Sequence, residues 1–236
     1  MSIDTASTTV RRLTPDDMTT AAGLFARAFS DDPLNVLLIP DANERRRAHA
    51  RLVHPRLVRA LRYGHVYCAT QAESMCGLAV WAPPHVRLSA RPPLNLLPST
   101  LRGASRFAPG RPRLARSMLS EPQLILRQSS VRRRAVAGAR DGGAWHLAGL
   151  AVAPEYQGQG IARALLDPMV ARADLDGTGV WLETNYPTNV PLYQRFGFTV
   201  TSHLPGRGVM PDWWLMQRPP SPPAGTPSQH KEIPEP

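Results

Sequence analysis

The sequence is poor in the features that mark a disulfide-braced, metal-binding or membrane-spanning protein. Its 236 residues include two cysteines, Cys68 and Cys76, too few for a disulfide framework or a multi-cysteine zinc site. We expect both to be reduced core residues, with a bond across neighbouring strands as the alternative. No apolar run of about 18 residues is present, which predicts no membrane span. The first residues lack a signal-peptide pattern, so we expect a cytoplasmic protein.

Lysine is almost missing, and one long segment is almost free of acids. Arginine supplies every one of the 28 cationic side chains except Lys231. Residues 85–140 hold twelve arginines against one acid, Glu121, although the whole chain carries a formal charge of only +10. Such a block can bind nucleic acid, a membrane surface or an anionic cofactor, or can be a solvated surface. Because Phe107 is its only aromatic residue and single-strand binding uses stacked aromatics, we favour the solvated surface and expect no nucleic-acid partner.

The composition along the chain predicts one domain and a tail. We assign residues 1–218 to a single domain and treat 85–140 within it as an irregular helical insertion rich in arginine and proline. The last eighteen residues, 219–236, include seven prolines and are expected to be disordered.

Hydrophobic patterning predicts a mixed α/β fold. Strand-like segments are a short one at 9–13, a hairpin from "HVYCAT" and "MCGLAVWAPP", then "AWHLAGLAVAP", "TGVWLETN" and a closing pair from "FTVTSHL" and "PDWWLMQRP". One helical segment follows the cap Thr14, and a second, "ANERRRAHARLVHPRLVRALRYG", ends at Gly64. A third occupies 161–174, and a short one lies in "PTNVPLYQRFGF".

A glycine turn between a strand and a helix is the most informative local feature. In "PEYQGQGIARALLD", Gly158 and Gly160 stand where the first amides of a helix lack intrahelical partners and the helix dipole is positive. Glycine lets a backbone approach an anion closely. The spacing is neither a P-loop nor a dinucleotide fingerprint, which would need glycine at Arg163. The alternative is a tight connection that binds nothing.

Three motifs in order resemble a known family. Gln157, Gly160 and Ala162 fit the pattern Q/R-x-x-G-x-G/A, "VWLET" follows as a strand, and "PTNVPLYQRFGFTV" places Tyr193 before a Gly-Phe pair. Together they resemble the GCN5-related N-acetyltransferases (GNAT), and among these look most like puromycin N-acetyltransferase and its relatives. The resemblance covers residues 145–218, is fainter over 9–82 and is absent from 85–140.

The resemblance implies a fold and a cofactor site. The fold is a twisted, mostly antiparallel sheet flanked by helices, in which strands 145–152 and 180–184 splay apart and leave backbone groups unpaired. The pantetheine arm of acetyl-CoA would enter this gap as an added strand does, with its pyrophosphate on the glycine turn. The implied cofactor-binding residues are Leu150, Ala151, Val152, Gln157, Gly158, Gln159, Gly160, Ile161, Ala162 and Asn189.

The resemblance also implies the chemical roles. Tyr193 would protonate or hydrogen-bond the leaving thiolate, unless its ring only packs in a corner. Glu183 would act as the base, and two-residue alternation places it on the same face as Trp181. His146, His65 and Tyr67 are weaker candidates. Asp31 and Asp32 would line the acceptor site and attract a cationic amine, unless they are ordinary turn residues.

We therefore expect an acetyl-CoA-dependent N-acetyltransferase without a metal. Its acceptor would be a primary amine of a small molecule, antibiotic or nucleoside-like, attacking the thioester directly. The alternatives are a protein, peptide or polyamine acceptor, or a non-catalytic acyl-CoA-binding regulator. A homodimer is left open, and no membrane association is expected.

Overall fold

A computed structural model of the chain describes residues 7–32, 35–36, 39, 41–63, 65–84, 86, 122–206 and 211–221, without the side chains of 50–52, 122–129 and 140. Most of the arginine-rich insertion before residue 122, and the tail beyond 221, lie outside the described residues. The last part of that insertion is a regular 20-residue helix.

Seven strands form one sheet in the order β1-β2-β3-β4-β5-β7-β6. They are β1 (Thr9–Arg12), β2 (Val66–Gln71), β3 (Ser74–Ala82), β4 (Trp145–Val152), β5 (Val180–Thr184), β6 (Thr199–Leu204) and β7 (Trp213–Arg218). The neighbours β4 and β5 are parallel, and every other neighbouring pair is antiparallel. The predicted mixed, mostly antiparallel sheet is therefore confirmed.

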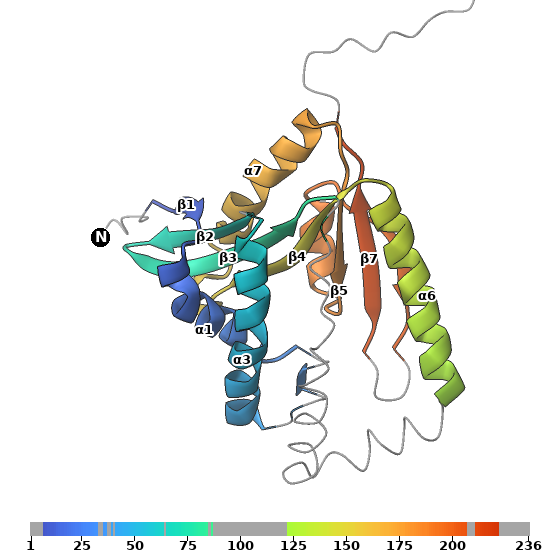
Figure 1. Ribbon diagram of the computed structural model, residues 1–236, viewed down its shortest axis with the longest axis horizontal. Coiled ribbons are helices and arrows are strands. Elements are labelled where there is room, and N and C mark those ends of the chain that lie inside the picture. The colour runs from blue at the N-terminus through green and yellow to red at the C-terminus, as the bar shows by residue number, and fades with distance from the viewer. Residues whose placement is uncertain are drawn as a thin grey trace, which may run out of the picture.

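Helices cover both faces of the sheet (Figure 1). They are α1 (Met18–Ala28), α3 (Ala42–Leu61), α6 (Pro122–Asp141), α7 (Ile161–Leu175) and α8 (Asn189–Gln194), with short 3-10 turns at Pro15–Asp17 and Pro154–Tyr156. Buried residues of α7 and α8 share one core with Leu182 of β5. Buried residues of α1 and α3 share a second core with Leu78 of β3. Buried residues of α6 share a third core with Trp181 of β5. Because Leu78 and Trp181 point away from the first core, α1, α3 and α6 cover the face opposite α7 and α8.

The two cysteines lie in different cores. Cys68 packs with the α1 and α3 side and Cys76 with the α7 side, and both are buried free thiols. The predicted reduced core pair is confirmed, and the alternative disulfide is not formed because the side chains occupy opposite faces of the sheet.

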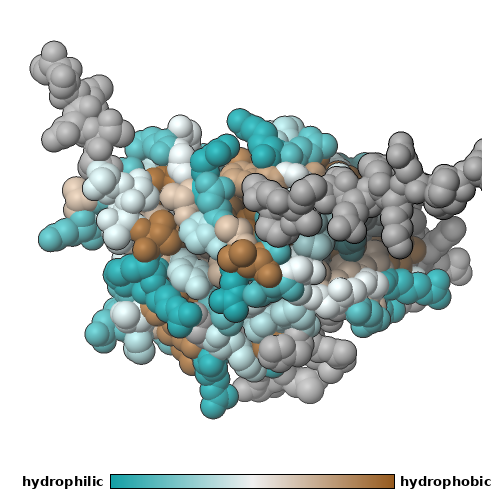
Figure 2. Space-filling view, turned by 90° about the horizontal axis from the view of Figure 1, so that it is seen from above, coloured by the Kyte–Doolittle hydropathy of each residue, from teal (hydrophilic) through white to brown (hydrophobic). Residues whose placement is uncertain are grey.

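Apolar residues on the surface are dispersed. Seen from above, the hydrophobic side chains form small patches separated by hydrophilic ones (Figure 2). Within the described ranges no helix combines the length and the apolar character needed to cross a membrane.

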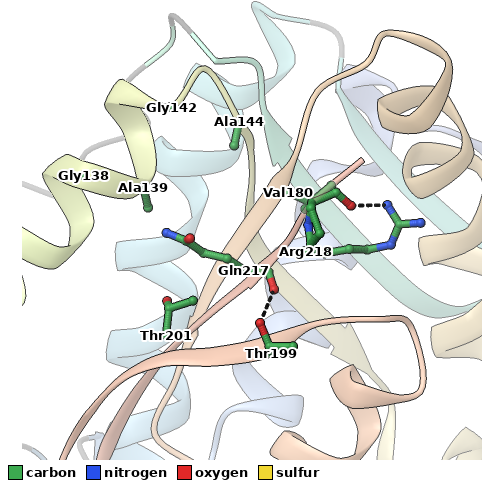
Figure 3. A pocket seen from close by; sticks show the side chains of 10 residues that line it. Gly138, Ala139, Gly142, Ala144, Val180, Thr199, Thr201, Gln217 and Arg218 are labelled. Carbon is green, nitrogen blue, oxygen red and sulfur yellow. Dashed lines mark hydrogen bonds between the residues drawn. The ribbon is translucent and has the colours of Figure 1, made fainter. Parts of the chain in front are cut away.

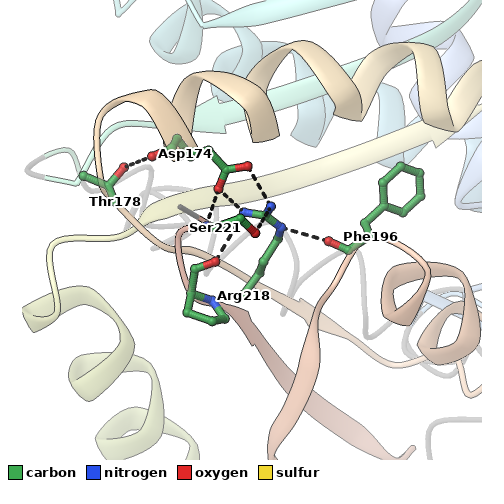
Figure 4. A network of polar contacts seen from close by, with 7 residues as sticks. Asp174, Thr178, Phe196, Arg218 and Ser221 are labelled. Carbon is green, nitrogen blue, oxygen red and sulfur yellow. Dashed lines mark hydrogen bonds and ion pairs between the residues drawn. The ribbon is translucent and has the colours of Figure 1, made fainter. Parts of the chain in front are cut away.

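A partly buried ion pair ties α7 to the last strand. Arg218 donates to both carboxylate oxygens of Asp174 at 2.6 and 2.8 Å and also to the carbonyl of Phe196 (Figure 4). The backbone amide of Ser221 donates to the same carboxylate. The hydrogen bonds from Arg218 hold the pKa of Asp174 below its ordinary value. The pair fixes α7 against the end of the sheet that lies away from the glycine turn.

We expect Asp174→Asn to lower the free energy of unfolding by about 3 kcal/mol, because it leaves the Arg218 guanidinium buried without a counter-charge. The control is Asp176→Asn, which breaks an exposed ion pair with Arg172 on the same helix and should cost under about 0.5 kcal/mol. Since the pKa of Asp174 is depressed in the fold, the pair stabilises at neutral pH and its contribution is lost as the pH falls through the folded pKa. Urea denaturation of both variants checks this, and equal costs would contradict it.

Candidate active site

The sheet opens between β4 and β5. These strands pair at Trp145–Val180, His146–Trp181 and Leu147–Leu182, and no further. On its other edge β4 stays paired with β3 as far as Val152. The backbone of residues 149–152 therefore lacks a strand partner on the β5 side, and the predicted splay is present. Figure 1 shows β4 and β5 together at their beginnings and pointing apart at their ends.

A bulge in β4 prepares this opening. Trp81 is opposite Leu147 and Val80 is opposite Gly149, so Ala148 is an extra residue in β4. A bulge of this kind bends a strand and increases its twist. It also exchanges the faces to which later residues point, so that Ala151 packs on the α1 side whereas Leu147 packs on the α7 side.

The glycine turn begins α7 beside the gap. Gly158 and Gly160 have φ of 79° and 80°, a left-handed backbone that favours glycine. No atom lies within 4 Å of where a Cβ would be at either position, so the turn faces open space. Gly160 is the N-cap of α7. The amides of the first helical residues therefore have no helical carbonyl four residues earlier to which they could donate. The turn thus has the open amides that an anionic group such as a pyrophosphate requires.

Two glycines outside the turn allow helices to pack closely against the sheet at the site. A Cβ on Gly77 of β3 would lie 2.6 Å from Cγ2 of Ile161, so the first turn of α7 sits directly on the sheet. A Cβ on Gly149 would lie 2.8 Å from Cζ of Phe25, so α1 presses on β4 at the start of the gap. Sequence reasoning missed both, because a glycine inside a strand signals only a close approach without naming its partner.

The glutamines of the turn are already engaged. Gln159 donates from its side chain to the carbonyl of Glu155 at 3.1 Å. Gln157 donates at 3.4 Å to the carbonyl of Val152, the last residue of β4. One acceptor at the open edge of β4 is therefore covered by a side chain of the turn itself.

Tyr193 and Asn189 lie on the α7 face. Tyr193 is buried, with its ring 5.9 Å from that of Phe198, and burial raises the pKa of its hydroxyl well above the ordinary value. Asn189 donates to the hydroxyl of Thr184, the last residue of β5, at 3.4 Å. The α8 residues and the glycine turn thus flank the gap from the same face.

Glu183 lies on the opposite face, one residue beyond the last β4–β5 pair. Its Oε1 accepts two hydrogen bonds of 2.8 Å, from Nε1 of Trp213 and from Nε of Arg132. Glu183 and Trp181 share a face, as alternation predicts. The contact with Arg132 of α6, 51 residues earlier, has no local sequence signal.

The two predicted acceptor-site acids differ. The side chain of Asp31 is 92% exposed, with an oxygen 3.7 Å from Nη2 of Arg45. Asp32 is buried and accepts a hydrogen bond from the amide of Asn35 at 3.1 Å. Burial and the charges of both acids raise the pKa of Tyr186, two residues after β5, to about 12. Both acids are therefore close enough to Tyr186 to influence it electrostatically.

An aromatic cluster lies on the same side and was not predicted. Phe25 and Phe29 of α1 are stacked, with centroids 4.5 Å apart, and the ring of His49 of α3 lies 6.1 Å from each. Burial and the charge of Arg56 lower the pKa of His49 to about 4. The spacing of four residues between the phenylalanines signals that they share a helix face, but it cannot show that this face meets β4.

The weaker base candidates lie away from the gap. His146, near the start of β4, is stacked on Trp181 with centroids 3.6 Å apart. His65 lies edge-on to Trp145, 4.8 Å between centroids, at the same end of the strand. Tyr67 of β2 packs against the core on the α7 side, and β2 is separated from β4 by β3.

A hollow between α6 and the β5–β7–β6 edge is also remote from the gap (Figure 3). Its lining includes Val180, the first residue of β5, and Arg218, the last residue of β7. Among the residues the structure describes, no group of three or more His, Cys, Asp or Glu side chains could hold a metal ion.

Comparisons with known proteins agree with this geometry. The family described as "Acetyltransferase (GNAT) domain" matches residues 129–200. An uncharacterized N-acetyltransferase of Schizosaccharomyces pombe is 27% identical over 195 residues, covering 80% of this chain and 73% of that protein. The crystal structure of histone acetyltransferase HPA2 and related acetyltransferase from Corynebacterium glutamicum has a TM-score of 0.59 at 22% identity, covering 92% and 99% of the two chains. PaiA N-acetyltransferase from Thermoplasma acidophilum, solved in complex with coenzyme A, has a TM-score of 0.51 at 13% identity, covering 90% and 99%.

The sheet opened between two parallel strands, with helices on both faces, matches the fold of solved acetyltransferases. Residues 129–200 match the acetyltransferase domain of the GNAT superfamily, and the curated relative and the solved structure support an acyltransferase. The superfamily uses acetyl-CoA as its acyl donor.

His49 gives the α1–α3 side a measurable pH dependence. Its pKa is about 4 in the fold and about 6.5 in an unfolded chain, so below pH 6.5 the unfolded chain binds a proton that the fold does not. We expect the free energy of unfolding to fall by about 2 kcal/mol between pH 7 and 4.5 through this group. His49→Gln should remove that part of the pH dependence in urea denaturation. His54→Gln, an exposed position on the same helix, should retain it, and identical pH profiles for the two variants would refute the assignment.

Proposed function

We propose that the protein transfers the acetyl group of acetyl-CoA to a primary amine of a small molecule. The observation that carries the proposal is the end of β4–β5 pairing at Leu147–Leu182, immediately beside the open glycine turn. The thioester of acetyl-CoA supplies the electrophilic carbon. The chain supplies the open backbone edge of β4, the amides of the glycine turn and the polar side chains of Tyr193 and Glu183.

The donor would lie along the open edge of β4. The main-chain groups of Leu150 and Val152 face the open edge and can pair with the amides of a pantetheine arm, whereas those of Ala151 face β3. The amides from Gln157 to Ala162 can hold the pyrophosphate, and Asn189 can contact the arm from the α8 side. Because Gln157 covers the carbonyl of Val152, its side chain must leave that oxygen before an arm can use it.

The main chain and Tyr193 would stabilise the charges that develop. We expect the backbone amide of Leu150 to donate to the carbonyl oxygen, since the register turns that of Ala151 toward β3, and one such donor is worth about 3 kcal/mol. The raised pKa of Tyr193 keeps its hydroxyl protonated, so it can donate a hydrogen bond to the departing sulfur. A strongly acidic phenol is not needed for that role.

Glu183 would receive the amine proton. The amine nitrogen attacks the thioester carbon, the carbon–sulfur bond breaks, and the proton lost by nitrogen passes to the carboxylate directly or through water. Both structural hydrogen bonds use Oε1, so Oε2 is the oxygen that the two clamping donors leave to the amine.

The acceptor side favours a cationic amine with a flat apolar body. Asp31 and Asp32 attract an ammonium group, and the stacked Phe25–Phe29 pair offers an apolar wall against β4 at Gly149. Aromatic amines, including antibiotic and nucleoside-like ones, combine these features. The Corynebacterium protein is named a histone acetyltransferase, so lysine peptides form the second acceptor class to test.

We expect incubation with acetyl-CoA and a panel of aromatic amines, polyamines and lysine peptides to yield products heavier by one acetyl group, and mostly from the aromatic amines. Mass spectrometry detects the products, and calorimetry measures acetyl-CoA binding without an acceptor. Preferential acetylation of the peptides would replace the small-molecule assignment. Binding of acetyl-CoA without any product would favour a non-catalytic regulator.

Tyr193→Phe should lower kcat by about 10- to 100-fold, because the leaving sulfur loses its hydrogen bond. The Kd for acetyl-CoA should change little, since the proposed role acts on the leaving sulfur rather than on binding. Tyr63→Phe, at an exposed turn position just after α3, is the control and should retain full turnover. Full turnover in Tyr193→Phe would show that this ring only packs.

A further inference from the structure

Arg132 differs from its neighbours on α6 because it reaches the gap. Its Nε lies 2.8 Å from Oε1 of Glu183, and its guanidinium carbon lies 5.7 Å from the centre of the Trp213 ring. Trp213 donates to the same carboxylate oxygen. The next two residues on the helix, Arg133 and Arg134, are solvent-exposed.

The helix that carries Arg132 is fixed against the sheet. Val136, one turn later, and Ala139 are buried together with Trp181, Trp213 and Leu215. The guanidinium is therefore presented from a packed helix rather than from a loop. Stacking on the indole further limits its orientation.

Two donors on one oxygen determine which oxygen of Glu183 stays available. A glutamate side chain has three rotatable bonds, and without partners its carboxylate samples many positions. Arg132 from α6 and Trp213 from β7 both donate to Oε1. These two contacts fix the orientation of the carboxylate, so that Oε2 points away from both donors. Catalysis is sensitive to displacements of about 1 Å in such groups.

We propose that Arg132 is a positioning residue for acetyl transfer, which acts by clamping Glu183 so that Oε2 meets the acceptor amine. The inference rests on the proposed role of Glu183 as proton acceptor. An exposed ion pair contributes only about 0–1 kcal/mol to stability, so the pair's effect should appear in turnover rather than in folding.

The positive charge of Arg132 also predicts how binding of the amine responds when Arg132 is replaced. A guanidinium on the acceptor side repels an ammonium group. Removing it should leave the KM of a cationic amine unchanged or lower, while kcat falls because the carboxylate is no longer held. A variant that only disturbed the fold would raise KM and lower the melting temperature together.

The test uses the full chain, acetyl-CoA and 2-phenylethylamine, replaced by the best amine of the panel if another is faster. Arg132→Gln should lower kcat about tenfold with an unchanged melting temperature, and Arg132→Lys should recover part of the loss. Arg133→Gln is the matched control and should behave as the unmodified protein. In a Glu183→Gln background, Arg132→Gln should have no further effect, because the group through which it acts is gone.

A spectroscopic readout is independent of turnover. The indole N–H resonance of Trp213, assigned with Trp213→Phe, should shift in Arg132→Gln and stay in place in Arg133→Gln. Additive losses in the double variant, or full turnover in Arg132→Gln beside an inactive Glu183→Gln, would overturn the role of Arg132 alone. Full turnover in Glu183→Gln would remove the base assignment and this proposal with it, and absence of acetylation of every amine would remove the proposed function.

Discussion

The structure depends on the point at which β4 stops pairing with β5. Parallel strands joined through a helix can run side by side for their whole length, yet here the ladder ends after Leu182. The bulge at Ala148 bends β4 away, and β3 keeps the other edge of β4 bonded, so only one edge is opened. Unpaired backbone inside a sheet is costly unless a partner or water satisfies it. The opening thus presents backbone groups with which a strand-like ligand can pair.

The gap separates two chemical environments. The α7 face holds the glycine turn and Tyr193, a buried hydroxyl that stays protonated. The opposite face holds Glu183, the two loop acids and the α1 aromatic pair. Around the gap, the glycine turn and Tyr193 thus lie on one face, and Glu183 lies on the other together with its donors Arg132 and Trp213. In the proposed reaction the thioester lies between them, so leaving-group stabilisation and proton removal come from different faces.

The parts of the site that are local in sequence were predictable. The strand, left-handed glycines and helix from 145 to 175 are consecutive, and two-residue alternation puts Glu183 with Trp181. The contacts between segments distant in sequence were not predictable. Arg132 contacts Glu183 across 51 residues, and glycine is needed at 149 only because Phe25 lies on it. The end of the arginine-rich segment became the regular helix α6, because its apolar positions find Trp181 and Trp213 to pack against. Such tertiary partners are absent from local patterning.

Binding and activating a cationic amine make opposite demands on the acceptor side. Carboxylates that attract an ammonium group also stabilise its proton, which the reaction must remove. In the proposed reaction, the loop acids meet this conflict by their placement. Asp31 is almost fully exposed, so its field is screened and serves mainly to attract, whereas Asp32 is buried and shares its charge with the amide of Asn35. The carboxylate at the gap is Glu183, whose Oε1 is compensated by Arg132 and Trp213. In the proposed reaction, attraction of the amine is thus left to the loop and removal of its proton to β5.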